Sequence, residues 1–151
     1  MKLREIVVGT LCVLALSGCG SSSGASKTAT PVPTAARSLG FTVGLVTDIG
    51  GLNDKSFNHE ANLGMLMAEK AFGVKGKAIE SKRLSDYVPN LTSFAQQHTG
   101  LTIAIGFSMA NAVYQVATRF PTEKFALVDS TPADAKGNAV KLPNVAVPRF
   151  E

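Results

Sequence analysis

Apolar and polar residues alternate along the chain with two different periods, one typical of strands and one typical of helices. Short apolar runs rich in β-branched residues predict strands at residues 41–46, 101–105 and 125–128, with weaker candidates at 77–81 and 144–147. In the segments between these runs, apolar residues recur three or four positions apart. Because strands and helices alternate strictly, the pattern predicts an α/β domain built on a doubly wound parallel sheet.

Three helices are expected in these intervening segments. The first ends near Gly73, a residue type that suits a helix C-terminus. Its apolar stripe consists of Phe57, Ala61, Gly64, Ala68 and Phe72. The second helix has its apolar face within residues 88–95 and ends near Gly100, and the third covers residues 108–119, just before Pro121.

The beginning of the chain has the pattern of a secretory signal. Two basic residues, Lys2 and Arg4, precede an apolar run at residues 6–16 that is too short for a typical membrane-spanning helix. The run ends in Leu-Ser-Gly-Cys at residues 16–19, which resembles a bacterial lipobox. Cleavage is therefore expected before Cys19, whose thiol would carry lipid. A plain secretory signal with an incidental cysteine is the alternative.

These features divide the chain into three parts. Residues 1–18 are the expected lipoprotein signal peptide, residues 19–40 the lipidated cysteine and a flexible tether rich in Ser, Thr, Ala, Gly and Pro, and residues 41–151 the ligand-binding lobe. Cys12 would leave with the signal, so the mature chain would keep Cys19 alone, without a disulfide or a thiolate metal site. A lipid anchor would hold the protein at the extracytoplasmic face of the cell membrane.

Composition and charge favour a soluble binding domain over a nucleic-acid-binding protein. The 151 residues are 45% hydrophobic and 17% charged, which is enough apolar material for one domain with a core. The net charge is +4, but the basic residues are scattered and only Lys82 and Arg83 are adjacent. A surplus of this size without a basic run indicates an ordinary basic surface.

Candidate chemistry gathers where strands end. Asp48, the turn at residues 106–108 and Asp129 each follow a predicted strand, and parallel strands place such positions on one edge of the sheet, where α/β proteins bind ligands. Two glycines and the ring of Phe57 come after Asp48, which suits a small-molecule pocket with an aromatic platform. An ordinary loop, with Phe57 packed in the core, is the alternative. Phosphate binding is disfavoured because there is no phosphate-binding glycine motif and Asp48 would repel the anion.

No catalytic set or metal site assembles from the sequence. The two histidines, His59 and His98, lack metal-ligand spacing, and Ser108 is not in a nucleophile elbow. Asp48 and Asp54 could form a metal pair, but Asp54 stands where a helix needs a cap. The sequence therefore favours binding over catalysis, without a cofactor.

Several motifs in order resemble one family. The run TDIGGLNDKSFN at residues 47–58 resembles the signature of the basic membrane protein family of bacterial lipoproteins, which bind nucleosides and deliver them to ABC importers. The same order continues with DYVPNL at 86–91, IGFSMA at 105–110 and FALVD at 125–129. The resemblance covers roughly residues 41–146, and it implies one lobe of a type I periplasmic-binding-protein-like fold.

The resemblance also implies residue roles. Phe57 would stack on a purine ring, and Asp48 and Asn58 would hydrogen-bond the edge of the base. Ser108 and Met109 would lie near the ribose. Asp129 would accept hydrogen bonds from the ribose hydroxyls. A flat heterocycle gains from an aromatic face, and a carboxylate is a strong acceptor for hydroxyls.

The chain also departs from the family pattern. Family members commonly have Gln at the position of His59 and Trp at that of Asn62, and they have two lobes where this sequence has about one. The expected function is therefore capture of purine nucleosides for an ABC permease by a chain that is apparently truncated. An inactive remnant or a surface antigen is the alternative. A sugar-kinase-like phosphate loop is disfavoured, because a helical period follows Asp54 where such an enzyme needs a β-hairpin.

Overall fold

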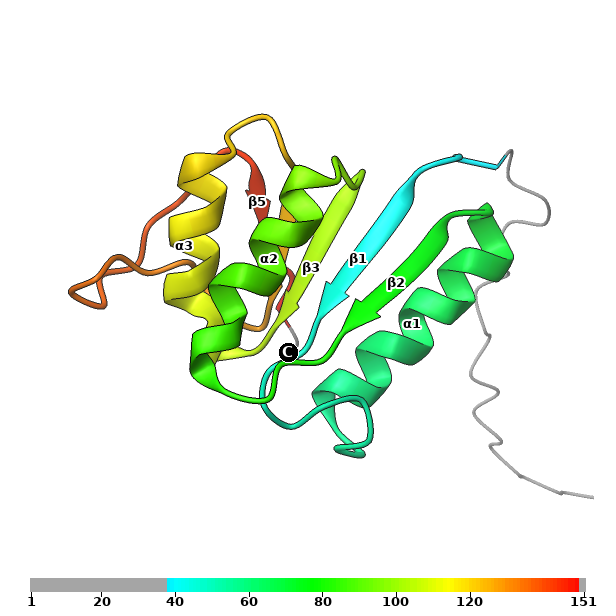
Figure 1. The fold of residues 1–151 in the computed structure, drawn as a ribbon, viewed down its shortest axis with the longest axis horizontal. Coiled ribbons are helices and arrows are strands. Elements are labelled where there is room, and N and C mark those ends of the chain that lie inside the picture. Colours follow the sequence, from blue (N-terminus) through cyan, green and yellow to red (C-terminus); the bar gives the residue numbers. More distant parts are fainter. Residues whose placement is uncertain (1–37, 150–151) are drawn as a thin grey trace, which may run out of the picture. The chain divides into compact units, whose positions relative to one another are not determined.

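The computed structural model describes residues 38–149, in which five parallel strands form one sheet (Figure 1). In chain order the strands are β1 (Thr42–Val46), β2 (Lys75–Ile79), β3 (Leu101–Ile105), β4 (Phe125–Val128) and β5 (Val145–Ala146). Across the sheet they lie in the order β2-β1-β3-β4-β5. The helices between them are α1 (Phe57–Phe72), α2 (Tyr87–Gln96) and α3 (Ala110–Arg119), and short 3-10 turns, η1 (Leu84–Asp86) and η2 (Phe107–Met109), precede α2 and α3.

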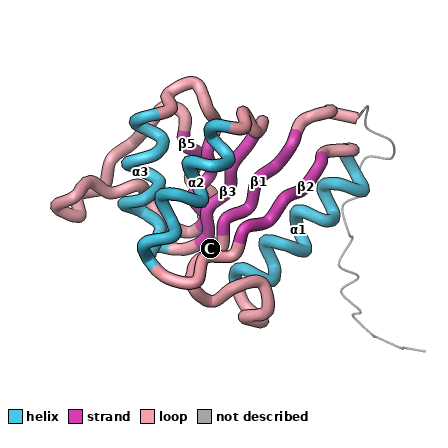
Figure 2. Tube along the Cα trace, viewed as in Figure 1, coloured by secondary structure: helices cyan, strands magenta, loops and turns pink. Residues whose placement is uncertain are grey.

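Helices cover both faces of the sheet. On one face Met65 of α1 forms a buried cluster with Leu45 of β1 and Ile105 of β3. On the other face α2 and α3 contribute to a larger cluster, which includes Val46 of β1 and Phe94 of α2. Consecutive residues of β1 thus belong to opposite layers, because side chains alternate along a strand. In Figure 2 the strands separate α1 from α2 and α3, and the predicted doubly wound α/β fold is confirmed.

The bounds of the elements agree with the sequence pattern where strands are buried and differ at the edge of the sheet. β3 and β4 occupy the predicted residues, whereas β2 begins two residues earlier than predicted, at Lys75. β2 is an edge strand with exposed positions, so its sequence has little apolar pattern to mark its ends. The third helix begins at Ala110 rather than at 108, because the preceding residues form the tighter turn η2.

The strand order creates a switch point between β1 and β3. β1 pairs with β2 on one side and with β3 on the other, and all these pairs are parallel. The chain leaves β1 towards α1 on one face and leaves β3 towards α3 on the opposite face. The loops at the carboxyl ends of β1 and β3 therefore diverge, and a crevice at such a point is where open α/β sheets bind ligands.

The start of α1 depends on Asp54. The Asp54 carboxylate accepts hydrogen bonds from the backbone N–H groups of Ser56 (2.9 Å), His59 (3.0 Å) and Asn58 (3.2 Å). The N–H groups of Asn58 and His59 belong to the first turn and have no partner within the helix, so Asp54 satisfies them from two residues before the N-cap position, Ser56, whose own side chain makes no capping bond. Partial burial raises the pKa of Asp54, but these bonds and one from the Asn58 side chain lower it more. The net pKa lies below the ordinary 3.8.

The membrane-related predictions concern other residues. The expected signal peptide at 1–18, Cys19 and most of the tether lie outside residues 38–149. Among the helices of the described segment, none combines the length and apolar composition that a membrane crossing needs.

Close packing between β1 and α2 generates a stability prediction. A Cβ atom at Gly44 would lie 2.6 Å from Cγ of the Phe94 ring, which is fully buried. We expect Gly44→Ala to lower the free energy of unfolding by about 1–3 kcal/mol, the usual cost of overpacking a core. Gly64→Ala is the control, since nothing lies within 4 Å of its Cβ position and Ala favours a helix by roughly 1 kcal/mol. Equal urea midpoints for the two variants would contradict this packing.

The cap at Asp54 generates a pH prediction. Because its pKa is lower in the folded chain than in the unfolded chain, the charged carboxylate stabilises the fold above pH 3.8, and this contribution is lost as the pH falls through the folded pKa. In Asp54→Asn, the free energy of unfolding should fall less steeply than in wild type when the pH is lowered from 5 towards 3, roughly the window of this titration. Urea titrations at each pH measure both slopes, and identical slopes would count against the cap.

Candidate functional site

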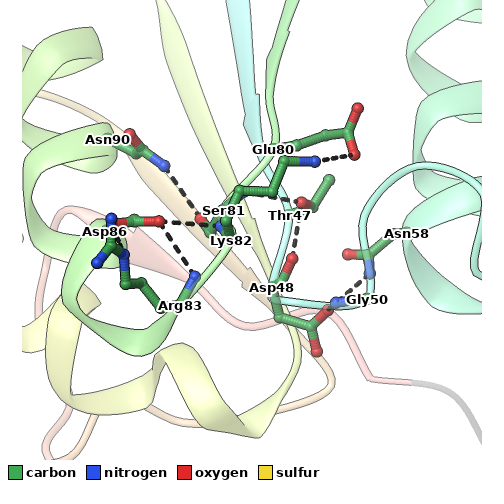
Figure 3. A network of polar contacts seen from close by, with 10 residues as sticks. All are labelled: Thr47, Asp48, Gly50, Asn58, Glu80, Ser81, Lys82, Arg83, Asp86 and Asn90. Carbon is green, nitrogen blue, oxygen red and sulfur yellow. Dashed lines mark hydrogen bonds and ion pairs between the residues drawn. The ribbon is translucent and has the colours of Figure 1, made fainter.

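The carboxyl ends of β1 and β2 are fastened together by a buried threonine. Thr47 is completely buried, and its hydroxyl donates to the carbonyl oxygen of Asp48 at 2.8 Å. The same hydroxyl oxygen accepts from the N–H of Ser81, at 3.3 Å, in the loop after β2 (Figure 3). The Ser81 hydroxyl in turn accepts from the Asn90 side chain of α2. The backbone that carries Asp48 is therefore fixed by groups from three elements.

The carboxylate of Asp48 lies at the switch point. Its Oδ1 accepts hydrogen bonds from the N–H of Gly50 (2.9 Å) and from Nδ2 of Asn58 (2.7 Å). Its Oδ2 lies on the side of β3, 3.7 Å from where a Cβ atom on Gly106 would stand. Within residues 38–149 no group donates a hydrogen bond to Oδ2. One oxygen thus holds the loop, and the other is an acceptor available to a ligand.

Asn58 is a buried residue that holds the Asp48 carboxylate in place. Its side chain is 1% exposed, and Nδ2 donates both to Asp48 and to Oδ2 of Asp54 at 3.1 Å. Its Oδ1 is buried without a partner among the described residues. The structure thus shows Asn58 as a positioning residue, while its predicted contact with the edge of a base stays a prediction.

Phe57 stands at the first position of α1, next to Asn58. Its side chain is 51% exposed, so it is not a buried core residue. It lines an apolar groove on the α1 face of the sheet, together with Ala61 and Gly64 of α1 and Ile103 and Val128 of the strands. Phe57 is thus half-exposed at the surface, and its stacking role stays a prediction.

The residues after β3 separate into exposed and buried ones. Ser108 is half-buried, with its hydroxyl 3.3 Å from that of Tyr87, whereas the Met109 side chain is completely buried in the core. Phe107, which the sequence analysis did not select, is 83% exposed. A large apolar residue directly after a strand-ending glycine was the available signal. Of the three residues in η2, the described structure therefore offers a ligand the side chains of Phe107 and Ser108.

Carboxylates dominate the charge at this edge of the sheet. Besides Asp48, Glu80 follows β2 and Asp129 follows β4. Asp129 has a left-handed backbone (φ 57°), and its N–H donates to the Pro148 carbonyl, so its exposed side chain is held at the turn. Glu80 pairs with exposed Lys82 at 3.1 Å, a contact that contributes little in water.

Electrostatics therefore favour ligands that donate hydrogen bonds, such as hydroxyls and amines, over phosphates. In the part of the chain from 38 to 149, no group of three or more His, Cys, Asp or Glu side chains is arranged to hold a metal ion.

Comparison with known proteins identifies relatives of this chain. The family model described as PnrA-like ABC transporter substrate-binding protein matches residues 41–150. A nucleoside-binding protein of an ABC transporter from Lactococcus lactis is 35% identical over 143 residues, covering 90% of this chain and 39% of the relative. An uncharacterized lipoprotein of Pyrococcus horikoshii is 33% identical over 142 residues, covering 93% of this chain and 34% of the relative.

Solved structures show the same fold. The solute-binding protein of an ABC transporter system from Aeropyrum pernix K1 matches with a TM-score of 0.62 and 29% identity, over 71% of this chain and 28% of that one.

The chain spans about a third of the length of the two relatives from Lactococcus lactis and Pyrococcus horikoshii.

The match over residues 41–150 confirms the resemblance found in the sequence motifs. The family consists of substrate-binding proteins, which also confirms the preference for binding over catalysis. The chain belongs to the PnrA-like family of ABC transporter substrate-binding proteins.

Proposed function

We propose that this chain carries a nucleoside-binding edge of a lipoprotein that captures purine nucleosides for an ABC importer. The observation that carries the proposal is the free Oδ2 of Asp48 at the switch point between β1 and β3. An acceptor fixed there suits a ligand that presents N–H or O–H groups to the sheet. The nucleoside-binding relative from Lactococcus lactis supports nucleosides as the ligand class.

The arrangement of side chains fits a nucleoside better than a nucleotide. Phe57 offers a half-exposed ring on which a base can stack. Asp129 is an exposed carboxylate that can accept hydrogen bonds from ribose hydroxyls, and Ser108 adds a hydroxyl near the same edge. A phosphate on the ligand would be repelled by the carboxylates of Asp48 and Asp129, so its charge would weaken binding.

Location and partner follow from the same proposal. The relative from Pyrococcus horikoshii carries the name lipoprotein, and residues 16–19 of this chain resemble a lipobox. A lipid on Cys19 and a tether up to residue 40 would hold the domain at the extracytoplasmic face of the membrane, within reach of an ABC permease. The ligand would pass from the sheet edge to that permease.

The ligand prediction is tested by NMR titration of the chain with inosine, guanosine and adenosine. The described residues form an open edge that contacts one side of a ligand, while binding still removes the ligand's translational and rotational freedom. We therefore expect a Kd of about 1 mM or weaker, with shifts centred on Asp48, Phe57 and Asp129. The monophosphates should bind more weakly still. Tighter binding of the monophosphates, or shifts located elsewhere, would contradict the proposed site.

Two variants separate stacking from packing at Phe57. Phe57→Leu should weaken nucleoside binding by a factor that corresponds to about 1–3 kcal/mol of stacking, whereas Phe57→Tyr keeps the aromatic face and should bind nearly as wild type. Both variants keep a large side chain at a half-exposed position, so the unfolding midpoint should change little. Equal affinities for the Leu and Tyr variants would show that the ring has no stacking role.

Membrane attachment is tested at Cys19. Cys19→Ala removes the thiol that would carry lipid, so most of the protein should move from the membrane fraction to the soluble fraction, or remain unprocessed. Cys12→Ala is the matched control, since this cysteine lies inside the apolar segment and its loss should leave fractionation unchanged. Membrane retention of the Cys19 variant at the wild-type level would exclude the lipobox.

A further inference from the structure

The outer side of α1 carries an apolar surface that the sheet does not use. Leu63, Leu66 and Met67 are 39%, 48% and 67% exposed, respectively. Met65 is the side chain of α1 that enters the buried cluster with the sheet. Since 100° separates successive helical residues, Leu63 and Met67 project from the side of the helix roughly opposite to Met65. The apolar surface therefore faces away from the domain's own core.

Two opposite charges lie at the ends of this surface. Glu60, Leu63, Met67 and Lys70 are spaced by three, four and three residues, which places them along one face of α1. We call these four residues the outer stripe. Glu60 and Lys70 are both exposed, and no described residue forms an ion pair with either of them. The stripe is thus apolar in its middle, acidic towards the helix N-terminus and basic towards its C-terminus.

This arrangement is self-complementary in the antiparallel direction. Suppose that a second copy of α1 lies antiparallel to the first, with the two Met65 residues at the same level. Residues of the two helices whose numbers add up to 130 then lie level with each other. Glu60 of one copy then lies level with Lys70 of the other, at both ends of the pair. Leu63 lies level with Met67 of the other copy. A two-fold axis generates all four contacts from one stripe, as an isologous interface requires.

We propose that the outer stripe of α1 binds a second copy of this chain through a two-fold, antiparallel helix pair. An anionic membrane surface is the other partner that an exposed apolar helix face suggests, but it needs several cations, and the stripe has one cation balanced by one carboxylate. One helix face per copy is a small interface, so the dimer is reversible and forms as the concentration rises. The contact uses none of the proposed ligand contacts Asp48, Phe57, Ser108 and Asp129, although Glu60 also lines the groove beside Phe57.

Charge reversal tests the proposal directly. Sedimentation equilibrium of the full chain in mild detergent, over a dilution series, should show a monomer–dimer equilibrium. Glu60→Lys and Lys70→Glu each place like charges opposite one another at both ends of the pair, so each should weaken the dimer about tenfold. The double variant exchanges the charges and should restore it. Lys136 is an exposed lysine in the loop after β4. Lys136→Glu makes the same charge change as Lys70→Glu and should leave the equilibrium unchanged.

Disulfide trapping gives a second measurement of the orientation. In a chain with Cys12→Ser and Cys19→Ser, a mixture of Leu63→Cys and Met67→Cys should form the mixed disulfide faster than either single variant forms its own. Circular dichroism confirms that each variant is folded. A wild-type chain that stays monomeric, a double reversal that does not restore the dimer, or the absence of a preferred mixed disulfide would each overturn the proposal.

Discussion

The side-chain amide of Asn58 connects the end of β1 to the start of α1. Its Nδ2 donates to Asp48 at 2.7 Å and to Asp54 at 3.1 Å, so one buried group fixes a strand-end carboxylate and a helix cap together. Both neighbours are acceptors, which means that the nitrogen, and not the oxygen, must face them. The orientation of Asp48 towards the switch point follows from this clamp.

The loop between β1 and α1 also contains a glycine with a special backbone conformation. Gly51 has a left-handed backbone (φ 68°), and a Cβ atom there would lie 2.6 Å from Oε2 of Glu80. Glycine is favoured here by the left-handed backbone, whereas the Glu80 carboxylate is the end of a flexible side chain that can move aside. The remaining weakness is Oδ1 of Asn58, a buried acceptor without a partner among the described residues, which lowers stability relative to a fully satisfied network.

How much the sequence could predict depended on burial. The bounds of β3 and β4 followed from apolar runs that alternate between two covered faces, and the common edge for Asp48 and Asp129 followed from parallel topology. The 3-10 turn η2 was beyond reach, because Phe107 and Met109 are both apolar and the tight turn alone decides which one enters the core. The contacts of Asn58 were likewise invisible in the sequence, since they depend on how the loop between β1 and α1 folds back onto the first turn of the helix.

The charge of the whole chain is a poor guide to what this edge can bind. The sequence has a net charge of +4, which taken alone would suit an anionic ligand. At the carboxyl edge, however, Asp48, Glu80 and Asp129 follow the strands β1, β2 and β4, and the lysine nearest to Glu80 in sequence, Lys82, is paired with it. Interactions between exposed charges are screened over about 8 Å in physiological salt, so distant lysines contribute little here. The local carboxylates, and not the total charge, therefore decide that a neutral ligand with several donor groups is the better match.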